Sequence, residues 1–288
     1  MKKQFVFTID LERDVPGVLH ETYYGVDEGL PVLRDFFKSN GIAPDIFVSA
    51  ELSTHHEEIL KELGRDFVVG NHGYEHGLLL RRSWQAQKDD ITMSTRIIEE
   101  LTGAKVKQFR APNFSISGTT IEILDDLGYL VDSSVMPGRR MKRRGLFTMY
   151  DFRGAPTVIY HPNPRDVTQA DGTRIVEIPL TENPMLPGAP LGMGFLNKSG
   201  IKRTNEALSL VSGDYVIFLI HSWECVDILR YLPWMAREMA ELCNGDIGGL
   251  TSLLHSLDDD WEIVTLMELH DMWVNSPRES NSHVGEPR

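Results

Sequence analysis

Two histidines four residues apart are the pair most suggestive of chemistry in this sequence. His72 and His76 lie within Gly70–Gly77, directly after the short apolar run Phe67–Val69. A spacing of four places both imidazole rings on one face of a helical turn or a compact loop. Two neutral imidazoles, a carboxylate and an open position form a catalytic zinc-type site. The pair therefore predicts one bound divalent metal ion, with Zn²⁺ as the expected ion.

An acidic pair follows the first apolar run of the chain. Asp10 and Glu12 come at the end of Gln4–Ile9 and are two residues apart, so in an extended chain their carboxylates point to the same side. Alone, such a pair is more typical of a solvated loop. Its place after a strand matches that of the histidine pair, which favours a shared site.

Three further apolar runs also end in polar side chains. Arg110 follows Val106–Phe109, Asp132 follows a short run, and His221 follows Tyr215–Ile220. In a barrel of parallel strands, chemistry is located where the strands end. An arginine there can orient a carboxylate and lower its pKa, and a histidine can act as a general acid. The five strand ends together predict an active site.

The elements that would position these residues alternate along the chain. Expected strands lie near residues 4–9, 46–48, 67–69, 106–109, 129–131, 158–160, 175–178, 215–220 and 263–265. Expected helices lie near residues 27–39, 53–63, 83–101, 119–127, 202–210, 226–242 (kinked at Pro233), 247–257 and 266–273. Such alternation predicts an α/β fold, most simply a single (β/α) barrel of seven or eight parallel strands.

Two segments break this alternation. Residues 135–172 and 183–199 are rich in proline and glycine, so we expect long loops there. No linker forces a domain boundary, which predicts one catalytic domain over residues 1–274. The polar tail, residues 275–288, is expected to be disordered.

Composition excludes several classes of protein. The 288 residues include 29 Lys and Arg against 42 Asp and Glu, a net charge of −13 that disfavours nucleic acid as a partner. Two cysteines, Cys225 and Cys243, cannot form a disulfide framework or a four-cysteine zinc site. The apolar start stops at Asp10, short of an export signal, and no run approaches the ~18 apolar residues of a transmembrane segment. We therefore expect a cytoplasmic protein.

Five ordered motifs resemble those of the polysaccharide deacetylase family, the NodB-homology or carbohydrate esterase family 4 type. They are Thr8–Glu12, His72–His76, Arg110–Asn113, Asp132–Ser134 and Leu219–His221. The resemblance runs from residue 5 to about residue 224 and implies a distorted (β/α) barrel. It also implies metal-dependent hydrolysis of an N-acyl group, typically acetyl, on an amino sugar of a polysaccharide or of its intracellular precursor.

The resemblance assigns a role to each matching residue. It makes His72 and His76 metal ligands, and makes Asp10 the general base, paired with Arg110. Either Asp10 or Glu12 could be the carboxylate ligand, and Glu12 is the expected one because Leu11 occupies the position of the family's second aspartate.

The remaining motifs imply the acid and the pocket. Asp132 would tune His221, the acid that protonates the leaving amine. Leu219 would line the pocket for the acyl methyl group, and Pro112 and Asn113 would contact substrate, the backbone N–H of Asn113 holding the oxyanion.

Two positions depart from the family's pattern. Asn113 stands where a tyrosine is usual, and Val135 stands where the fourth motif has a tryptophan. Trp223 could fill part of the missing wall of the pocket.

A basic run, Arg139–Arg144, follows the fourth motif on an otherwise acidic chain. Such a run is often a solvated loop. Here Arg139 and Arg140 could bind a phosphate- or lipid-linked sugar, or contact an anionic membrane surface.

Three alternative functions stay open. His72–His76 also fits the His-x-x-Glu-His pattern of inverted zinc proteases, but that pattern requires a helix, and glycine costs about 1 kcal/mol per site there. A small-amide hydrolase acting on a formamide or cyclic ureide would use the same fold. A catalytically inactive barrel that binds saccharide is the third, and the presence of Asp10, both histidines and His221 argues against it.

Overall fold

The computed structural model describes residues 2–14, 22–143 and 147–276. Within them the main sheet has eight strands, and every pairing is parallel. From edge to edge the strands are β10 (Val176–Glu177), β5 (Val131–Asp132), β4 (Gln108–Phe109), β3 (Val68–Asn71), β2 (Asp45–Val48), β1 (Lys3–Leu11) and β11 (Tyr215–His221), with β12 (Trp261–Ile263) beside the start of β1.

The sheet curls but its ladder does not join β10 to β11. The chain between these two strands partly fills the opening: the backbone N–H of Ile217 donates to Thr181 Oγ1, and that of Leu219 donates to the carbonyl of Leu191. The predicted distorted barrel of seven or eight parallel strands is therefore confirmed.

Strand β1 lies at the centre of the fold. It is buried from Phe5 to Leu11, as expected of a parallel strand covered on both faces. Its register with β11 pairs Thr8 with Leu219 and Asp10 with His221. Two of the predicted site residues thus meet through backbone pairing alone.

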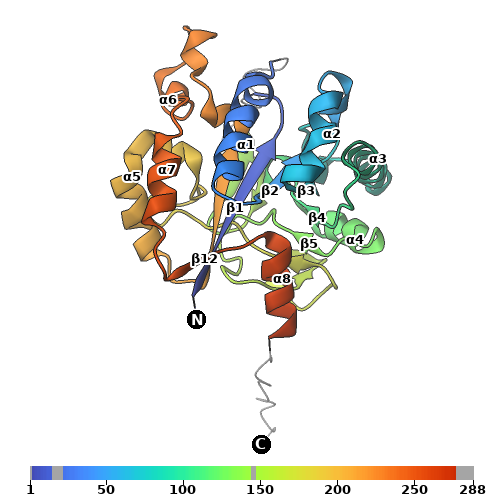
Figure 1. Cartoon of the computed structure of the whole chain (residues 1–288). Coiled ribbons are helices and arrows are strands. Elements are labelled where there is room, and N and C mark those ends of the chain that lie inside the picture. The colour runs from blue at the N-terminus through green and yellow to red at the C-terminus, as the bar shows by residue number, and fades with distance from the viewer. Residues whose placement is uncertain (1, 15–21, 144–146, 277–288) are drawn as a thin grey trace, which may run out of the picture.

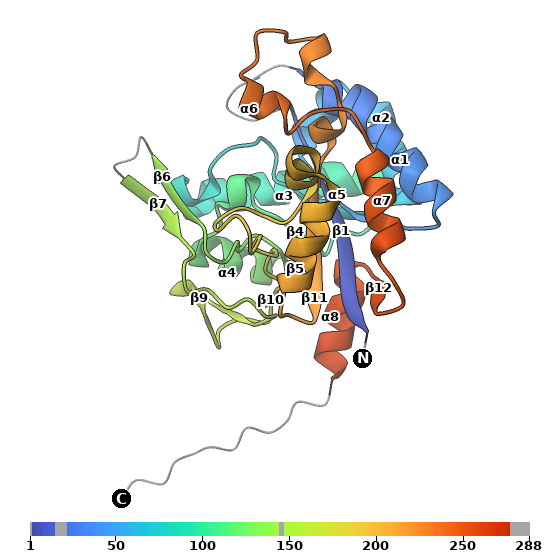
Figure 2. The ribbon, with the colours of Figure 1, turned by 90° about the vertical axis from the view of Figure 1, so that its left-hand side faces the viewer.

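Helices cover the outside of the sheet (Figures 1 and 2). They are α1 (Leu30–Ser39), α2 (Glu57–Asp66), α3 (Trp84–Thr102), α4 (Gly118–Asp126), α5 (Met193–Leu210), α6 (Arg237–Ala240), α7 (Gly248–Ser256) and α8 (Leu266–Asn275). Ser83 caps α3 by accepting a hydrogen bond from Ala86 N, and Gly103 ends it with a φ of 69°. The predicted boundaries of that helix are confirmed to within a residue.

The region expected as a long loop at residues 135–172 contains two hairpins. Strand β6 (Arg140–Arg143) pairs with β7 (Phe147–Asp151), and β8 (Pro162–Asn163) pairs with β9 (Asp166–Ala170). The proline and glycine content predicts turns but does not indicate the short strands between them. The expected strand at 158–160 is reduced to a single bridge between Tyr160 and Glu177.

Two other expectations are also wrong in part. Helix α5 begins at Met193, inside the expected loop 183–199. The expected helix 226–242 is replaced by a short 3₁₀ turn, Ile228–Arg230, and by α6. Pro233 lacks the N–H that a continuous helix needs, and the segment folds as successive turns. The tail expected to be disordered lies outside the described residues from 277 onward.

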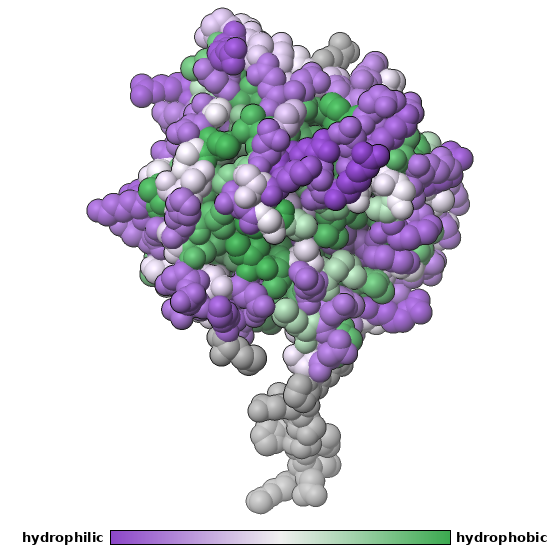
Figure 3. All heavy atoms as spheres, viewed as in Figure 1, coloured by the Kyte–Doolittle hydropathy of each residue, from purple (hydrophilic) through white to green (hydrophobic). Residues whose placement is uncertain are grey.

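Hydrophilic side chains predominate on the face in Figure 3, with hydrophobic ones between them. In the described part of the chain, no helix combines the length and the apolar character needed to cross a membrane.

Candidate metal centre and active site

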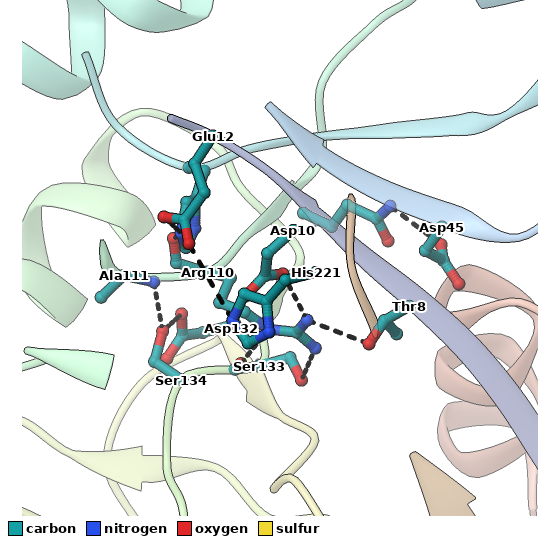
Figure 4. A network of polar contacts seen from close by, with 12 residues as sticks. Thr8, Asp10, Glu12, Asp45, Arg110, Ala111, Asp132, Ser133, Ser134 and His221 are labelled. Carbon is teal, nitrogen blue, oxygen red and sulfur yellow. Dashed lines mark hydrogen bonds and ion pairs between the residues drawn. The ribbon is translucent and has the colours of Figure 1, made fainter. Parts of the chain in front are cut away.

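The predicted site residues meet at the carboxyl ends of the strands (Figure 4). Strand β1 supplies Asp10 and leads into Glu12, β3 leads into His72, β4 leads into Arg110, and β11 ends at His221. The first four are almost fully buried, and the His221 side chain is 19% exposed. Successive parallel strands therefore bring together side chains that are over 200 residues apart.

Three of these residues form a candidate metal cluster. One ligand atom each from Glu12, His72 and His76 lies within 4.8 Å of the other two. Glu12 Oε2 is 3.5 Å from His72 Nε2 and 2.5 Å from His76 Nε2. Two atoms bound to one tetrahedral zinc ion at about 2.1 Å lie roughly 3.4 Å apart. The Glu12–His72 separation fits such an ion, and the Glu12–His76 separation is that of a hydrogen bond.

The charge of Glu12 suits a metal ligand. Burial alone would raise the pKa of this carboxyl group, but the charge of His76 and the close contacts with both histidines outweigh burial and hold the pKa well below its usual range. The carboxylate is therefore ionised within an almost completely buried cluster.

Neighbouring groups orient both imidazoles. His72 Nδ1 lies 2.8 Å from the carbonyl oxygen of Arg110, so it donates there and leaves Nε2 as the lone-pair atom facing Glu12. His76 Nδ1 lies 3.1 Å from the side-chain nitrogen of Asn113. The Asn113 amide can present its NH₂ or its carbonyl after a half turn, so it can serve either tautomer of His76.

Two residues without a predicted role hold the histidine loop. Asn71 Oδ1 accepts a 2.7 Å hydrogen bond from Gly73 N, and Asp90 Oδ1 accepts a 3.0 Å bond from Tyr74 N. Gly73 has a φ of 76°, which favours glycine. Nothing in the local sequence of Asn71 or Asp90 distinguishes them, because their function depends on the loop that they contact.

The predicted pair of Asp10 and Arg110 is present. Arg110 Nη1 donates to Asp10 Oδ1 at 2.7 Å and to Thr8 Oγ1 at 3.0 Å. Its Nε donates to the Ser133 carbonyl at 2.9 Å, and its Nη2 donates to Ser133 Oγ at 3.1 Å. Arg110 has no exposed surface, so its position is fixed from every side.

His221 faces the two acidic residues of β1. Its Nε2 is 3.9 Å from Asp10 Oδ2 and 4.0 Å from Glu12 Oε1, while its Nδ1 is 3.4 Å from Glu224 Oε2. Burial, the largest single influence, lowers the pKa of His221. Glu224, Glu12 and Asp10 together outweigh it and raise that pKa to about 9.

Asp132 has close partners of its own in the structure. It accepts a 2.6 Å hydrogen bond from Ser134 Oγ, and its carboxyl group shares a hydrogen bond with Glu177. Burial raises the pKa of Asp132 and, helped by the charge of Asp132, raises that of Glu177 still further. Among the described residues, the carboxylate facing His221 Nδ1 is Glu224.

The predicted pocket residues lie close to this centre. Trp223 stacks on His221 with ring centroids 4.6 Å apart, and its Nε1 donates a long hydrogen bond of 3.4 Å to Glu12 Oε1. Leu219 is two residues before His221 on β11, hence on the same face, and is almost fully buried. Pro112 begins a tight turn in which Asn113 has a φ of 53°.

The two predicted basic residues differ in their surroundings. The Arg139 guanidinium lies 5.2 Å from the ring centre of Phe114, the neighbour of Asn113. Arg140 donates to Thr148 Oγ1 and pairs with Asp151 across the β6–β7 hairpin. Arg139 is therefore next to the site, whereas Arg140 is bound to its own hairpin. Arg144 lies outside the described residues.

Comparisons with known proteins support the same family. Residues 22–131 match the family model described as polysaccharide deacetylase. A peptidoglycan deacetylase of Helicobacter pylori is 26% identical over 124 residues, a match spanning 43% of this chain and 42% of that protein. The resemblance to the polysaccharide deacetylase family is thus confirmed.

Solved structures share the fold. A putative polysaccharide deacetylase from Mycobacterium smegmatis has 16% identity and a TM-score of 0.62, with 94% of this chain and 90% of that chain covered. The structure of an allantoinase also has a TM-score of 0.62. It is 13% identical, with 95% of this chain and 90% of that chain covered. At these identities the likeness concerns the fold alone.

Proposed function

We propose that this chain is a metal-dependent hydrolase that removes an N-acyl group, most simply acetyl, from an amino sugar of a polysaccharide or its precursor. The observation that carries the proposal is the convergence of Glu12, His72 and His76, with Asp10 and His221 beside them. The match to a relative named peptidoglycan deacetylase supports an amino sugar as the substrate class.

The donor set fits a zinc ion. One carboxylate and two imidazoles leave a position open, and the His72 tautomer is fixed by the Arg110 carbonyl. A bound ion would polarise the amide carbonyl and lower the pKa of the attacking water. We assign Glu12, rather than Asp10, as the carboxylate ligand because Asp10 is already held by Arg110.

Asp10 is the proposed general base. Its Oδ1 accepts the hydrogen bond from Arg110, and its Oδ2 points towards His221 at 3.9 Å. Oδ2 is therefore the oxygen that accepts the proton of the attacking water. Arg110 holds the carboxylate in place.

His221 is the proposed general acid. Its Nε2 faces the centre and would give its proton to the leaving amine as the C–N bond breaks. The backbone N–H of Asn113 is the proposed donor to the developing oxyanion, at a turn that the Tyr150 hydroxyl fixes by donating to the Asn113 carbonyl at 2.8 Å. Leu219 would face the acyl methyl group.

The nature of the sugar carrier is part of the proposal. Arg139 packs against Phe114, next to Asn113, and could bind a phosphate of a nucleotide- or lipid-linked sugar. Such a substrate would match the expected cytoplasmic location.

The released product decides among the candidate functions, because deacylation of a sugar or a formamide gives a free amine, whereas opening of a cyclic ureide gives a ureido acid. The zinc-loaded protein is incubated with N-acetylated amino-sugar oligomers, with diphosphate-linked N-acetyl sugars, and with formamides and cyclic ureides. Free amine from a sugar, absent with His221→Ala, supports the proposal. Turnover of small amides alone would make the protein a small-amide hydrolase. Saccharide binding without turnover of any substrate would make it an inactive barrel.

A further inference from the structure

The turn after β11 places a buried carboxylate against the proposed acid. Glu224 lies in the 3₁₀ turn Ser222–Cys225, and its side chain is 8% exposed. Its Oε2 accepts a 2.7 Å hydrogen bond from the backbone N–H of His221 and lies 3.4 Å from Nδ1 of the same residue. One oxygen atom thus contacts both the backbone and the ring of His221.

The protein also fixes the position of Glu224. A Cβ atom at Gly194, in the first turn of α5, would lie 2.7 Å from Glu224 Oε1, so the absence of a side chain at Gly194 leaves room for the carboxylate. Asn197 Nδ2 donates to the backbone carbonyl of Glu224 at 2.9 Å.

Trp223 sets the plane of the His221 ring. It stacks on His221 with an interplanar angle of 23°. With the ring plane set by Trp223 and the rotation of the ring set by Glu224, Nε2 points at Asp10 Oδ2 and Glu12 Oε1.

We infer that Glu224 is the positioning residue for His221. Its carboxylate lies at ion-pair distance from Nδ1, turns Nε2 toward the reacting centre, and balances the positive charge of the protonated ring. This inference rests on the proposed role of His221 as proton donor. The family resemblance implied Asp132 for this role, and Asp132 contacts Ser134 and Glu177.

Two variants test the role of Glu224 in different ways. Glu224→Gln keeps the size and an acceptor oxygen but removes the charge. Gly194→Ala keeps the charge but pushes the carboxylate away. For both variants we expect kcat to fall about 10–100-fold, the range typical of partners that orient a functional imidazole, with KM and zinc content unchanged. The control is Glu241→Gln, which removes an equivalent charge from a residue paired with Arg237 and Lys198, and it should behave as wild type.

A spectroscopic measurement tests the contact without any substrate. In protein labelled with ¹⁵N-histidine, long-range ¹H–¹⁵N spectra report which ring nitrogen carries a proton, and His221→Ala assigns the signals. We expect a protonated Nδ1 in the wild type and a changed Nδ1 signal in both variants. An unchanged His221 signal in folded Glu224→Gln or Gly194→Ala would overturn the inference, even if kcat fell. If no amide is hydrolysed by the wild type, the proposed function fails, and the spectra still decide whether Glu224 positions His221.

Discussion

Arg110 Nη1 lies 2.7 Å from Asp10 Oδ1, and both side chains are buried where four strands end. Burying two charges is costly, and their attraction repays that cost only when the geometry is good and the remaining donors are satisfied. Arg110 meets this condition through Thr8 and Ser133, which take up its other donors.

Replacing Arg110 should therefore destabilise the fold. In Arg110→Met, Asp10 would be left as an uncompensated buried charge, and we expect the free energy of unfolding to fall by about 3–5 kcal/mol. Chemical denaturation measures it. The control is Arg174→Met, which breaks an ion pair between an 83% exposed arginine and Asp125 and should cost less than about 1 kcal/mol. If both variants lost the same free energy of unfolding, the buried Asp10–Arg110 pair would contribute no more to stability than an exposed ion pair does.

Removing a proposed ligand should remove the metal. We expect His72→Ala and Glu12→Ala to lose zinc in metal analysis after dialysis, while Asp10→Asn keeps zinc and loses about 10²–10⁴-fold in kcat as a missing general base would. His161→Ala is the control, because His161 contacts Ile175 and Trp273, away from the cluster. Full zinc occupancy in Glu12→Ala together with loss in Asp10→Asn would reverse the assigned roles.

The hydrogen-bonded pair of Asp132 and Glu177 predicts a pH dependence of stability. Both pKa values are raised in the folded protein, so the stabilising contribution is fully present below about pH 4 and is lost as the pH rises through the folded pKa values. In Glu177→Gln the amide can still accept from Val135 N and can donate to Asp132 without a titrating proton. We expect this variant to lose less stability than wild type between pH 5 and pH 9.

Urea unfolding at several pH values provides the comparison for Glu177→Gln. Burial raises the pKa of Asp45 to about 7, so Asp45 also causes stability to fall as the pH rises. The slope of unfolding free energy against pH should therefore be smaller in Glu177→Gln than in wild type, but not zero. Glu122→Gln, at an exposed position of α4, should keep the slope of the wild type. Parallel curves for wild type and Glu177→Gln would contradict the prediction.

Residue spacing predicted which side chains lie close together wherever neighbouring strands determine it. Asp10 and His221 are register partners, and His72 follows a buried strand, so apolar runs followed by polar residues were enough. The partners of Asp132 and His221 depend instead on tertiary contacts. Glu177 lies beside Asp132 because strand β10 pairs with strand β5. The two residues are 45 positions apart in the sequence, so no local sequence pattern predicts their contact.

The region after β11 shows where apolar spacing misleads. The apolar residues of 226–242 suit a helix, yet the segment packs as turns around Ile228 and Met235, which lie in one small core cluster with Trp223. In residues 226–242, packing against Trp223 outweighs the helix propensity of the sequence. The 3₁₀ turn Ser222–Cys225, which contains Glu224 and precedes this segment, was not predicted either.

The indole of Trp223 gives the last prediction. Its N–H contacts Glu12 Oε1, the oxygen that does not face His76, so it holds the carboxylate in the orientation that presents Oε2 to the two histidines. Trp223→Phe removes this N–H and retains an aromatic ring to stack on His221. Loss of such an outer contact typically costs about 10–100-fold in metal affinity, and we expect zinc affinity, measured by competition with a chelator, to fall within that range while the protein stays folded. Trp84→Phe, at a position 42% exposed on α3, should leave affinity unchanged. If Trp223→Phe binds zinc as tightly as wild type, the indole N–H does not position Glu12, and the contribution of Trp223 is limited to packing against His221.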